Sequence, residues 1–315
     1  MFLGASFIDF RLFRTQSAAV FFSYACVVLL LGLVLLTNAR IRGAESWLFF
    51  YGVSVQPVEA AKLVLIVLLA KFFSKRHVEI YRLQHLVVSA LYVAIPVLLA
   101  LLQPDLGSAL ILLVIWGAVI LFSGIKLRHF AILTALCVVM GVGAWLLILE
   151  PYQKARITSF INPYHDPEGG GYQMIQSMIA VGSGRVWGKG LGYGSQTHLH
   201  FLPEAETDFI FAAFAEEWGF LGVSVMLALF FVVWWRVIAI GMASSDNFSR
   251  LYTLGFATLL FVQSFIHIGM NMGILPITGI TLPFVSYGGS SLVTLLIGLG
   301  IVQNIKINAR RAVSE

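Results

Sequence analysis

The sequence predicts an all-α, polytopic membrane protein with about eight transmembrane helices and one long extracytoplasmic loop. Of its 315 residues, 59% are hydrophobic and only 11% are charged, whereas soluble domains carry about 25% charged residues. The mean hydropathy is +0.91. Apolar runs recur along the chain, long enough to supply the ~20 residues that cross ~30 Å of hydrocarbon. We therefore expect a single membrane domain over residues 1–315.

Eight apolar segments are expected to span the bilayer. They cover residues 15–37, 57–74, 84–103, 105–125, 129–149, 209–240, 251–273 and 287–305. The second contains Glu59 and Lys62, which lie three residues apart and therefore share a helix face, where each can neutralise the other. Charged residues within a span usually face a bundle interior or a wet cavity, which makes this pair a functional candidate. The first run is too long for a cleaved signal peptide and should anchor the chain.

The orientation follows from Lys and Arg in the short loops, which favour the cytoplasmic side. If eight spans alternate, one side carries Arg11, Arg14, Lys71, Lys75, Arg76, Arg82, Lys126, Arg128, Arg236, Arg250, Lys306, Arg310 and Arg311. The opposite short loops carry only Arg40 and Arg42. We therefore expect both termini in the cytoplasm and the long loop 150–208 outside, carrying the active site.

The long loop ends in an acidic stretch directly before the sixth span. Glu204, Glu206 and Asp208 fall within five residues. A carboxylate can act as a general base, and cations can hold a phosphate and stabilise its departure. The cations expected on this side are Arg40, Arg42, Arg156, Arg185 and Lys189. This set suits group transfer from a phosphorylated, membrane-held donor, but it equally suits an anion transporter, a lipid flippase, or a solvated acidic helix start.

Two further segments of the chain carry structural predictions. Tyr172, Ile175, Met178 and Ile179 recur at helical spacing, which predicts a short amphipathic helix at the membrane surface. The run from Gly273 to Ser291 is too rich in Gly and Pro for plain helix. Such backbone is either packed in protein, lines a wet cavity, or forms a tight outer loop. The side chains that could supply hydrogen bonds to this run are Asn271, Thr278, Ser286, Tyr287, Ser290 and Ser291.

The histidines and cysteines do not predict a protein metal site. His198 and His200 lack a third imidazole or thiol nearby, and both cysteines, Cys26 and Cys137, lie in apolar runs. The clustered acids could still recruit Mg²⁺ or Mn²⁺, because hard cations prefer oxygen ligands and phosphates. We expect no nucleic-acid partner.

Several stretches taken together resemble one family. They are Ser54-Val-Gln-Pro-Val-Glu-Ala-Ala-Lys-Leu63, Leu102-Gln-Pro-Asp-Leu-Gly-Ser-Ala-Leu110, Phe160-Ile-Asn-Pro-Tyr-His-Asp-Pro167, Thr207-Asp-Phe-Ile-Phe211, Ala215-Glu-Glu217 and Leu282-Pro-Phe-Val-Ser-Tyr-Gly-Gly-Ser290. In this order they resemble the SEDS family (shape, elongation, division and sporulation) of bacterial membrane peptidoglycan glycosyltransferases. The resemblance runs from about Phe7 to the C-terminus. Trp187-Gly-Lys-Gly-Leu191 is more similar to the rod-shape branch than to the division branch.

The resemblance implies an activity and a set of site residues. It implies polymerisation of lipid II in the bacterial inner membrane during cell elongation, by attack of a GlcNAc 4-hydroxyl on a MurNAc anomeric carbon, with undecaprenyl pyrophosphate leaving. The family's essential aspartate corresponds to Asp208, the expected general base. The residues expected to bind substrate are Lys62, Glu59, Gln103, Asp105, Arg156, Lys189, Glu204 and Ser286. Glu59 and Lys62 could instead be purely structural, and the whole chain could instead be a precursor flippase or a non-catalytic scaffold.

The resemblance also implies partners, and this sequence departs from the family at three points. The implied partners are a class B penicillin-binding protein that supplies transpeptidation, other membrane proteins of the elongation complex, and an assisting divalent cation, Mg²⁺ or Mn²⁺. Ten spans are usual, and this chain begins about where the second would end. Ser46 replaces a basic residue before Trp47, and Glu206 replaces a histidine. Glu206 either strengthens Asp208 as a base by like-charge repulsion or is only screened surface charge.

Overall fold

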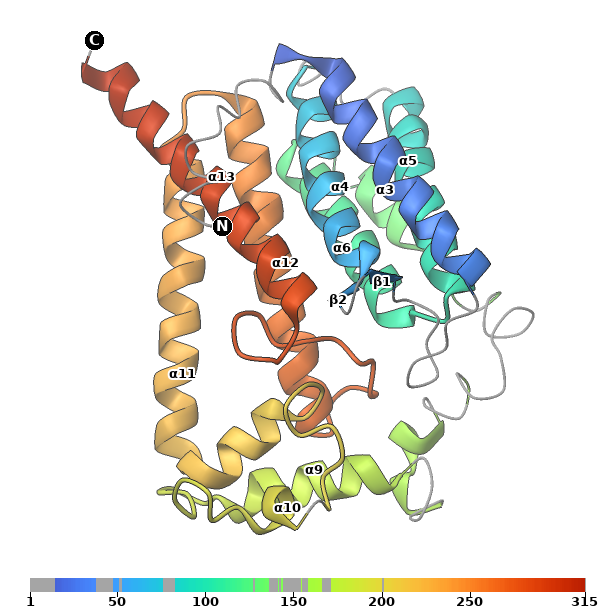
Figure 1. Ribbon diagram of the computed structural model, residues 1–315. Helices are drawn as coiled ribbons and strands as arrows, with labels where there is room; N and C mark the ends of the chain where they lie inside the picture. The colour runs from blue at the N-terminus through green and yellow to red at the C-terminus, as the bar shows by residue number, and fades with distance from the viewer. Residues whose placement is uncertain are drawn as a thin grey trace. The chain divides into compact units, whose positions relative to one another are not determined.

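Figure 1 shows a computed structural model of the chain, in which most of the described residues are helical. It describes residues 15–37, 48–50, 53–75, 83–126, 128–135, 141, 143, 154, 158–165, 171–199 and 201–314. The elements are α3 (Ser17–Thr37), β1 (Leu48–Phe50), β2 (Val53–Val55), α4 (Pro57–Ser74), α5 (Leu83–Leu102), α6 (Leu106–Phe122), the 3-10 turn Pro163–His165, α9 (Tyr172–Ser183), α10 (Ser195–His198), α11 (Ile210–Met242), α12 (Asn247–Asn271) and α13 (Gly289–Ser314).

Five of the described helices are long and apolar enough to cross a membrane. They are Ser17–Leu36 in α3, Gln84–Leu102 in α5, Ile210–Met242, Asn247–Asn271, and Gly289–Ala309 in α13. Helix α6 is apolar but shorter, and α4 carries three charged residues, Glu59, Lys62 and Lys71. Seven of the predicted spans coincide with these helices, and most of the eighth, 129–149, lies outside the described residues. The prediction of a helical, multi-pass membrane protein is confirmed.

The chain divides into two compact units, each discontinuous in sequence. Unit 1 comprises Met1–Ala131, Trp234–Val262 and Gly289–Glu315; unit 2 comprises Ile132–Val233 and Gln263–Gly288. The described part of the predicted loop 150–208 belongs to unit 2, together with most of α11, up to Val233, and the end of α12, from Gln263. The prediction of one domain over residues 1–315 stays a prediction.

In unit 1, helix α4 is surrounded by α3, α5, α6 and α13. Most of its side chains are therefore buried, including both charged residues of its first two turns. The core alongside it is aliphatic, with Leu31, Leu65, Ile66 and Ile111 almost fully buried. The strands β1 and β2 form a small antiparallel hairpin just before α4. Ser290 Oγ donates to Ser54 O at 3.2 Å and accepts from Gln56 N at 3.1 Å, which joins the start of α13 to this hairpin.

In unit 2, helix α9 coincides with the predicted short helix, and its buried face is formed by Met174, Ser177 and Ala180. This is not the face predicted from the spacing of apolar residues, on which Ile179 is 45% exposed. Helix α11 consists of two helical stretches joined at Gly219, whose φ of 64° and ψ of −166° are not helical. A positive φ of this kind is readily adopted only by glycine. The bend lies near the start of α11 in Figure 1 and separates a short first stretch from the long apolar one.

The segment between α12 and α13 is irregular, as the sequence predicts. Gly273 and Gly279 both have positive φ, 71° and 73°. Hydrogen bonds from Ser286 Oγ to Thr207 O and from Tyr287 N to Glu206 O hold this backbone within unit 2. These bonds join the segment to the acidic stretch that precedes α11; Ser286 and Thr207 lie 79 positions apart in the sequence.

Candidate functional site

The acidic stretch before α11 is fixed by three consecutive main-chain hydrogen bonds. Tyr287 N donates to Glu206 O at 2.9 Å. Ser286 Oγ donates to Thr207 O at 2.8 Å, and Asn271 Nδ2 donates to Asp208 O at 3.0 Å. All three donors come from the end of α12 and the irregular segment after it. The conformation at Asp208 is therefore set by tertiary contacts as well as by its own sequence neighbours.

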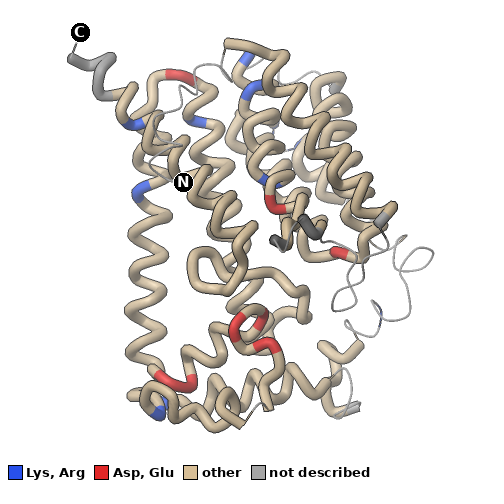
Figure 2. The backbone as a smooth tube through the Cα atoms, viewed as in Figure 1, with Lys and Arg blue, Asp and Glu red and all other residues tan. Residues whose placement is uncertain are grey.

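The side chains of this stretch differ in how far they are exposed. Phe209 is buried in a cluster with Ala180, Leu202 and Ala212. Glu206 is exposed, whereas Asp208 is half-buried. A Cβ atom added to Gly279 would lie 3.8 Å from Asp208 Oδ2, so the irregular segment passes directly beside this carboxylate. Figure 2 shows the acidic residues of unit 2 in red on this stretch and on the first part of α11.

Glu204 forms hydrogen bonds within its own turn. Its Oε2 accepts a hydrogen bond from Thr207 Oγ1 at 3.1 Å, and its carbonyl accepts from Thr207 N and Phe209 N. Among the described residues, no group of three or more His, Cys, Asp or Glu gathers as metal ligands. The carboxylates of this stretch therefore do not form a binding site for a resident metal ion. A divalent cation would take at most one or two of these carboxylates and complete its shell with substrate phosphates and water.

Glu216 organises the glycine-rich loop between α9 and the acidic stretch, and sequence reasoning missed this role. Its carboxylate is fully buried (0% exposed). It accepts hydrogen bonds from Lys189 Nζ at 2.7 Å, Gln196 N at 3.0 Å and Thr197 N at 3.3 Å, and from the hydroxyls of Ser195 and Thr197. The sequence signal that could have indicated this role is a carboxylate inside an otherwise apolar run. Lys189, expected to bind substrate, is thus ion-paired, and its substrate contact stays a prediction.

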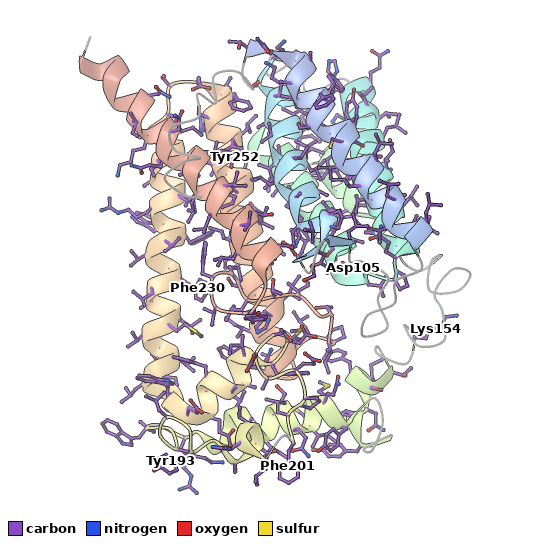
Figure 3. The ribbon with its side chains drawn as sticks, in the orientation of Figure 1. Asp105, Lys154, Tyr193, Phe201, Phe230 and Tyr252 are labelled. Atoms are coloured by element: carbon purple, nitrogen blue, oxygen red, sulfur yellow. The ribbon has the colours of Figure 1, made fainter. Side chains whose placement is uncertain are left out.

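In unit 1, the predicted polar residues gather at the start of α4 and the α5–α6 connection. Lys62 Nζ lies 2.7 Å from Glu59 Oε1, and both side chains are nearly fully buried. Gln103 Nε2 donates to Leu31 O at 2.7 Å. Asp105, labelled in Figure 3, caps α6 by accepting from Ser108 N at 2.9 Å.

The predicted site residues are therefore found in two groups. Glu59, Lys62, Gln103 and Asp105 belong to unit 1; Lys189, Glu204, Asp208 and Ser286 belong to unit 2. Ser286, expected to contact substrate, donates to Thr207 O and accepts from Leu282 N at 2.8 Å. Arg156, together with Arg40, Arg42 and Ser46, lies outside the described residues.

The helices define a multi-pass membrane protein, and comparison with known sequences defines its family. The family model for cell cycle proteins of the FtsW, RodA and SpoVE type matches residues 1–311. Stage V sporulation protein E of Bacillus subtilis is 38% identical over 307 residues, covering 96% of this chain and 82% of the relative. Peptidoglycan glycosyltransferase MrdB of Escherichia coli K12 is 40% identical over 281 residues, covering 89% and 75%. The chain belongs to the SEDS family, which confirms the resemblance.

Solved structures agree with this assignment. A chain from a structure on the coordination of polymerization and crosslinking by a peptidoglycan synthase complex matches with a TM-score of 0.77 and 32% identity. The match covers 98% of this chain and 88% of that one. The crystal structure of the rod shape determining protein RodA from Thermus thermophilus matches with a TM-score of 0.67 and 31% identity, covering 98% and 85%.

Proposed function

We propose that this chain is a peptidoglycan glycosyltransferase that polymerises lipid II into glycan strands during cell elongation, with Asp208 as its general base. The enzyme class is that of the relatives named above, MrdB among them. The similarity to RodA supports the elongation role within the family. The observation that carries the assignment of the base is the set of three consecutive hydrogen bonds that fix the main chain at Glu206, Thr207 and Asp208.

The proposed step is a displacement at the anomeric carbon of the donor MurNAc. The 4-hydroxyl oxygen of the acceptor GlcNAc forms a bond to that carbon while the bond from carbon to the pyrophosphate oxygen breaks. The hydroxyl proton passes to the Asp208 carboxylate, and undecaprenyl pyrophosphate leaves with the electron pair. A base must come within ~2.6–3.2 Å of the hydroxyl it deprotonates. A half-buried carboxylate on fixed backbone suits this task better than the exposed carboxylate of Glu206, two residues before it.

Positive charge would stabilise the leaving pyrophosphate, but two of the described lysines already form ion pairs with glutamates. Lys62 is bound to Glu59 and Lys189 to Glu216. We propose that Glu59, Lys62, Gln103 and Asp105 contact substrate or shape its cavity, as the family resemblance implies. We also propose that Mg²⁺ or Mn²⁺ assists, held chiefly by the substrate's own phosphates. Such an ion would neutralise charge on the leaving group; the described carboxylates provide no resident site for it.

The distribution of basic residues supports an orientation with both chain ends in the cytoplasm and Asp208 outside. Helix α4 has Glu59 in its first turn and Lys71 in its last. The α5–α6 connection, Gln103 to Asp105, has no Lys or Arg, whereas Lys126 follows α6. The α11–α12 connection is flanked by Arg236 and Arg250. The positive-inside rule puts the Lys- and Arg-rich ends in the cytoplasm.

The proposed partner is a class B penicillin-binding protein, which would cross-link the strands that this chain polymerises, alongside other membrane proteins of the elongation complex. The similarity to a chain of a peptidoglycan synthase complex, studied for polymerization and crosslinking, supports such an assembly.

The test is strand synthesis by the purified chain in detergent with fluorescent lipid II and Mg²⁺ or Mn²⁺, alone and with its class B partner. Wild type should make glycan strands and Asp208→Ala should make none. Glu206→Gln, which removes an exposed carboxylate two residues away, is the matched control and should retain activity. Equal product from wild type and Asp208→Ala would contradict the proposal. Movement of labelled lipid II across vesicles without strand formation would instead identify a flippase.

A further inference from the structure

The side chain of Asn271 connects helix α12 to the residue proposed as the base. Asn271 is the last residue of α12 and is fully buried (0% exposed). Its Nδ2 donates to Asp208 O at 3.0 Å and to His267 O at 2.8 Å. Its Oδ1 accepts from Ala212 N at 3.1 Å. The amide group thus makes three hydrogen bonds, all to main-chain groups.

These partners fix which atom of the amide is oxygen and which is nitrogen. The N–H of Ala212 can only donate, and the carbonyls of Asp208 and His267 can only accept. A flipped amide would place a donor against a donor and an acceptor against two acceptors. The assignment therefore follows from the network.

The position of the amide explains where α11 begins. Ala212 N–H and Asp208 O lie four residues apart, so they are the pair that one more helical hydrogen bond would join. Asn271 Oδ1 accepts from the first group and Nδ2 donates to the second. A side chain inserted in this way interrupts the helical ladder. It also satisfies one of the N–H groups that the first turn of α11 leaves without a helical partner. Helix α11 accordingly begins at Ile210, and Asp208 lies just outside it.

We infer that Asn271 is a positioning residue that acts on catalysis through Asp208. The inference rests on the proposed function of Asp208 as the base. Asn271 holds the Asp208 main chain outside the helix, while Ser286 holds the carbonyl of Thr207 next to it. Asn271 does not touch the reacting atoms; it sets the direction in which the Asp208 carboxylate leaves the backbone. A displacement of about 1 Å at such a group costs on the order of a hundredfold in rate.

The expected kinetic signature is a fall in kcat with little change in KM, because the interaction orients the base rather than binding the substrate. Asn271→Leu removes all three hydrogen bonds at similar size, Asn271→Ser removes them by shortening the side chain, and Asn271→Asp keeps an acceptor for Ala212 N–H. Each variant that folds should lower kcat at least tenfold, with KM within threefold of wild type and lipid II binding retained.

The matched control is Ser177→Ala. Ser177 Oγ donates to the main-chain O of Asn271 at 2.8 Å. This change therefore removes a buried hydrogen bond at the same residue and leaves the three bonds of the Asn271 side-chain amide in place. It should lower the melting temperature but leave kcat within twofold. Gel filtration and melting temperature, measured for every variant, separate loss of folding from loss of turnover.

The outcomes separate this inference from the proposed function. If Asp208→Ala abolishes strand synthesis while a folded Asn271 variant keeps kcat within threefold, the inference is wrong and the proposed base stands. If Asp208→Ala remains active, the proposed base itself is wrong. A rise in KM with unchanged kcat, or failure of all three Asn271 variants to fold, would show that Asn271 binds substrate or is merely structural, and would overturn the inference.

Discussion

At the scale of single residues, three acids close together in the sequence have three different environments. Glu206 is exposed, Glu204 bonds Thr207 within its own turn, and Asp208 is half-buried beside Gly279. A sequence pattern cannot separate such neighbours by itself, because the main chain at Glu206, Thr207 and Asp208 is held by residues 271–287. The family motif identified Asp208, and the hydrogen bonds around it give a physical reason for that choice.

The substitution Glu206→His tests whether the acid next to Asp208 has a role of its own. We predict that this variant keeps or exceeds the wild-type rate of strand synthesis, because the Glu206 side chain is exposed and its main-chain bond to Tyr287 does not depend on residue type. The measurement is the initial rate of strand synthesis from labelled lipid II by the variant and by the wild type. A loss of more than tenfold, about 1.4 kcal/mol in the barrier, would show that Glu206 contributes directly.

At the scale of elements, two buried charged groups organise the local structure around them. Glu216 holds the loop between α9 and the acidic stretch, and the Glu59–Lys62 pair lies in the first two turns of α4. The positions of the helices that carry these groups, α11 and α4, could be predicted from the sequence, because the length of an apolar run is a local property. The role of Glu216 depends on Gln196 and Thr197, about 20 residues away, and no local pattern shows it.

The variant Glu216→Gln should loosen the loop of residues 185–199. One carboxylate oxygen accepts from Gln196 N and Lys189, and the other from Thr197 N and Oγ1, so an amide must turn its NH₂ group toward donors. A lost buried hydrogen bond costs about 1–3 kcal/mol. We expect a lower melting temperature and faster proteolysis within the loop. Glu217 is the matched control, because its Oε1 accepts one hydrogen bond from this loop, from Gly192 N. Glu217→Gln should therefore lower the melting temperature less than Glu216→Gln does. Equal effects of the two variants would contradict the central role of Glu216.

The Glu59–Lys62 pair can be tested for function separately from stability. Removing one partner of a buried pair costs about 3–5 kcal/mol, whereas replacing both is often neutral. Lys62→Met alone should therefore destabilise the protein more than the double variant Glu59→Gln/Lys62→Met. If the pair contacts substrate, the double variant remains folded but loses strand synthesis. Full activity in the folded double variant would show that the pair is purely structural.

At the scale of the whole molecule, the sequence predicted more of the fold than of the site. Seven spans, the short helix α9 and the irregular segment before α13 follow from apolar length, period and Gly/Pro content. The insertion of Asn271 between Asp208 and Ala212 does not, because it joins segments about 60 residues apart. Hydropathy and helical period report on neighbours along the chain, whereas this contact depends on how α11 and α12 pack.

The orientation in the membrane gives a prediction for the whole chain. In a background of Cys26→Ala and Cys137→Ala, Glu206→Cys should react with a membrane-impermeant maleimide in spheroplasts. Ser245→Cys, in the exposed α11–α12 connection, should react only after permeabilisation. The reason is the excess of Lys and Arg on the side of Ser245. The reverse pattern of labelling would contradict the proposed orientation.

The most direct test of the account compares substrate binding with turnover in Asp208→Asn. This change keeps the size of the side chain and the main-chain bond from Asn271 but removes the basic oxygen. We predict that the purified variant binds fluorescent lipid II with an affinity within threefold of wild type and forms no glycan strands. Strand synthesis at the wild-type rate by Asp208→Asn would contradict the assignment of Asp208 as the general base.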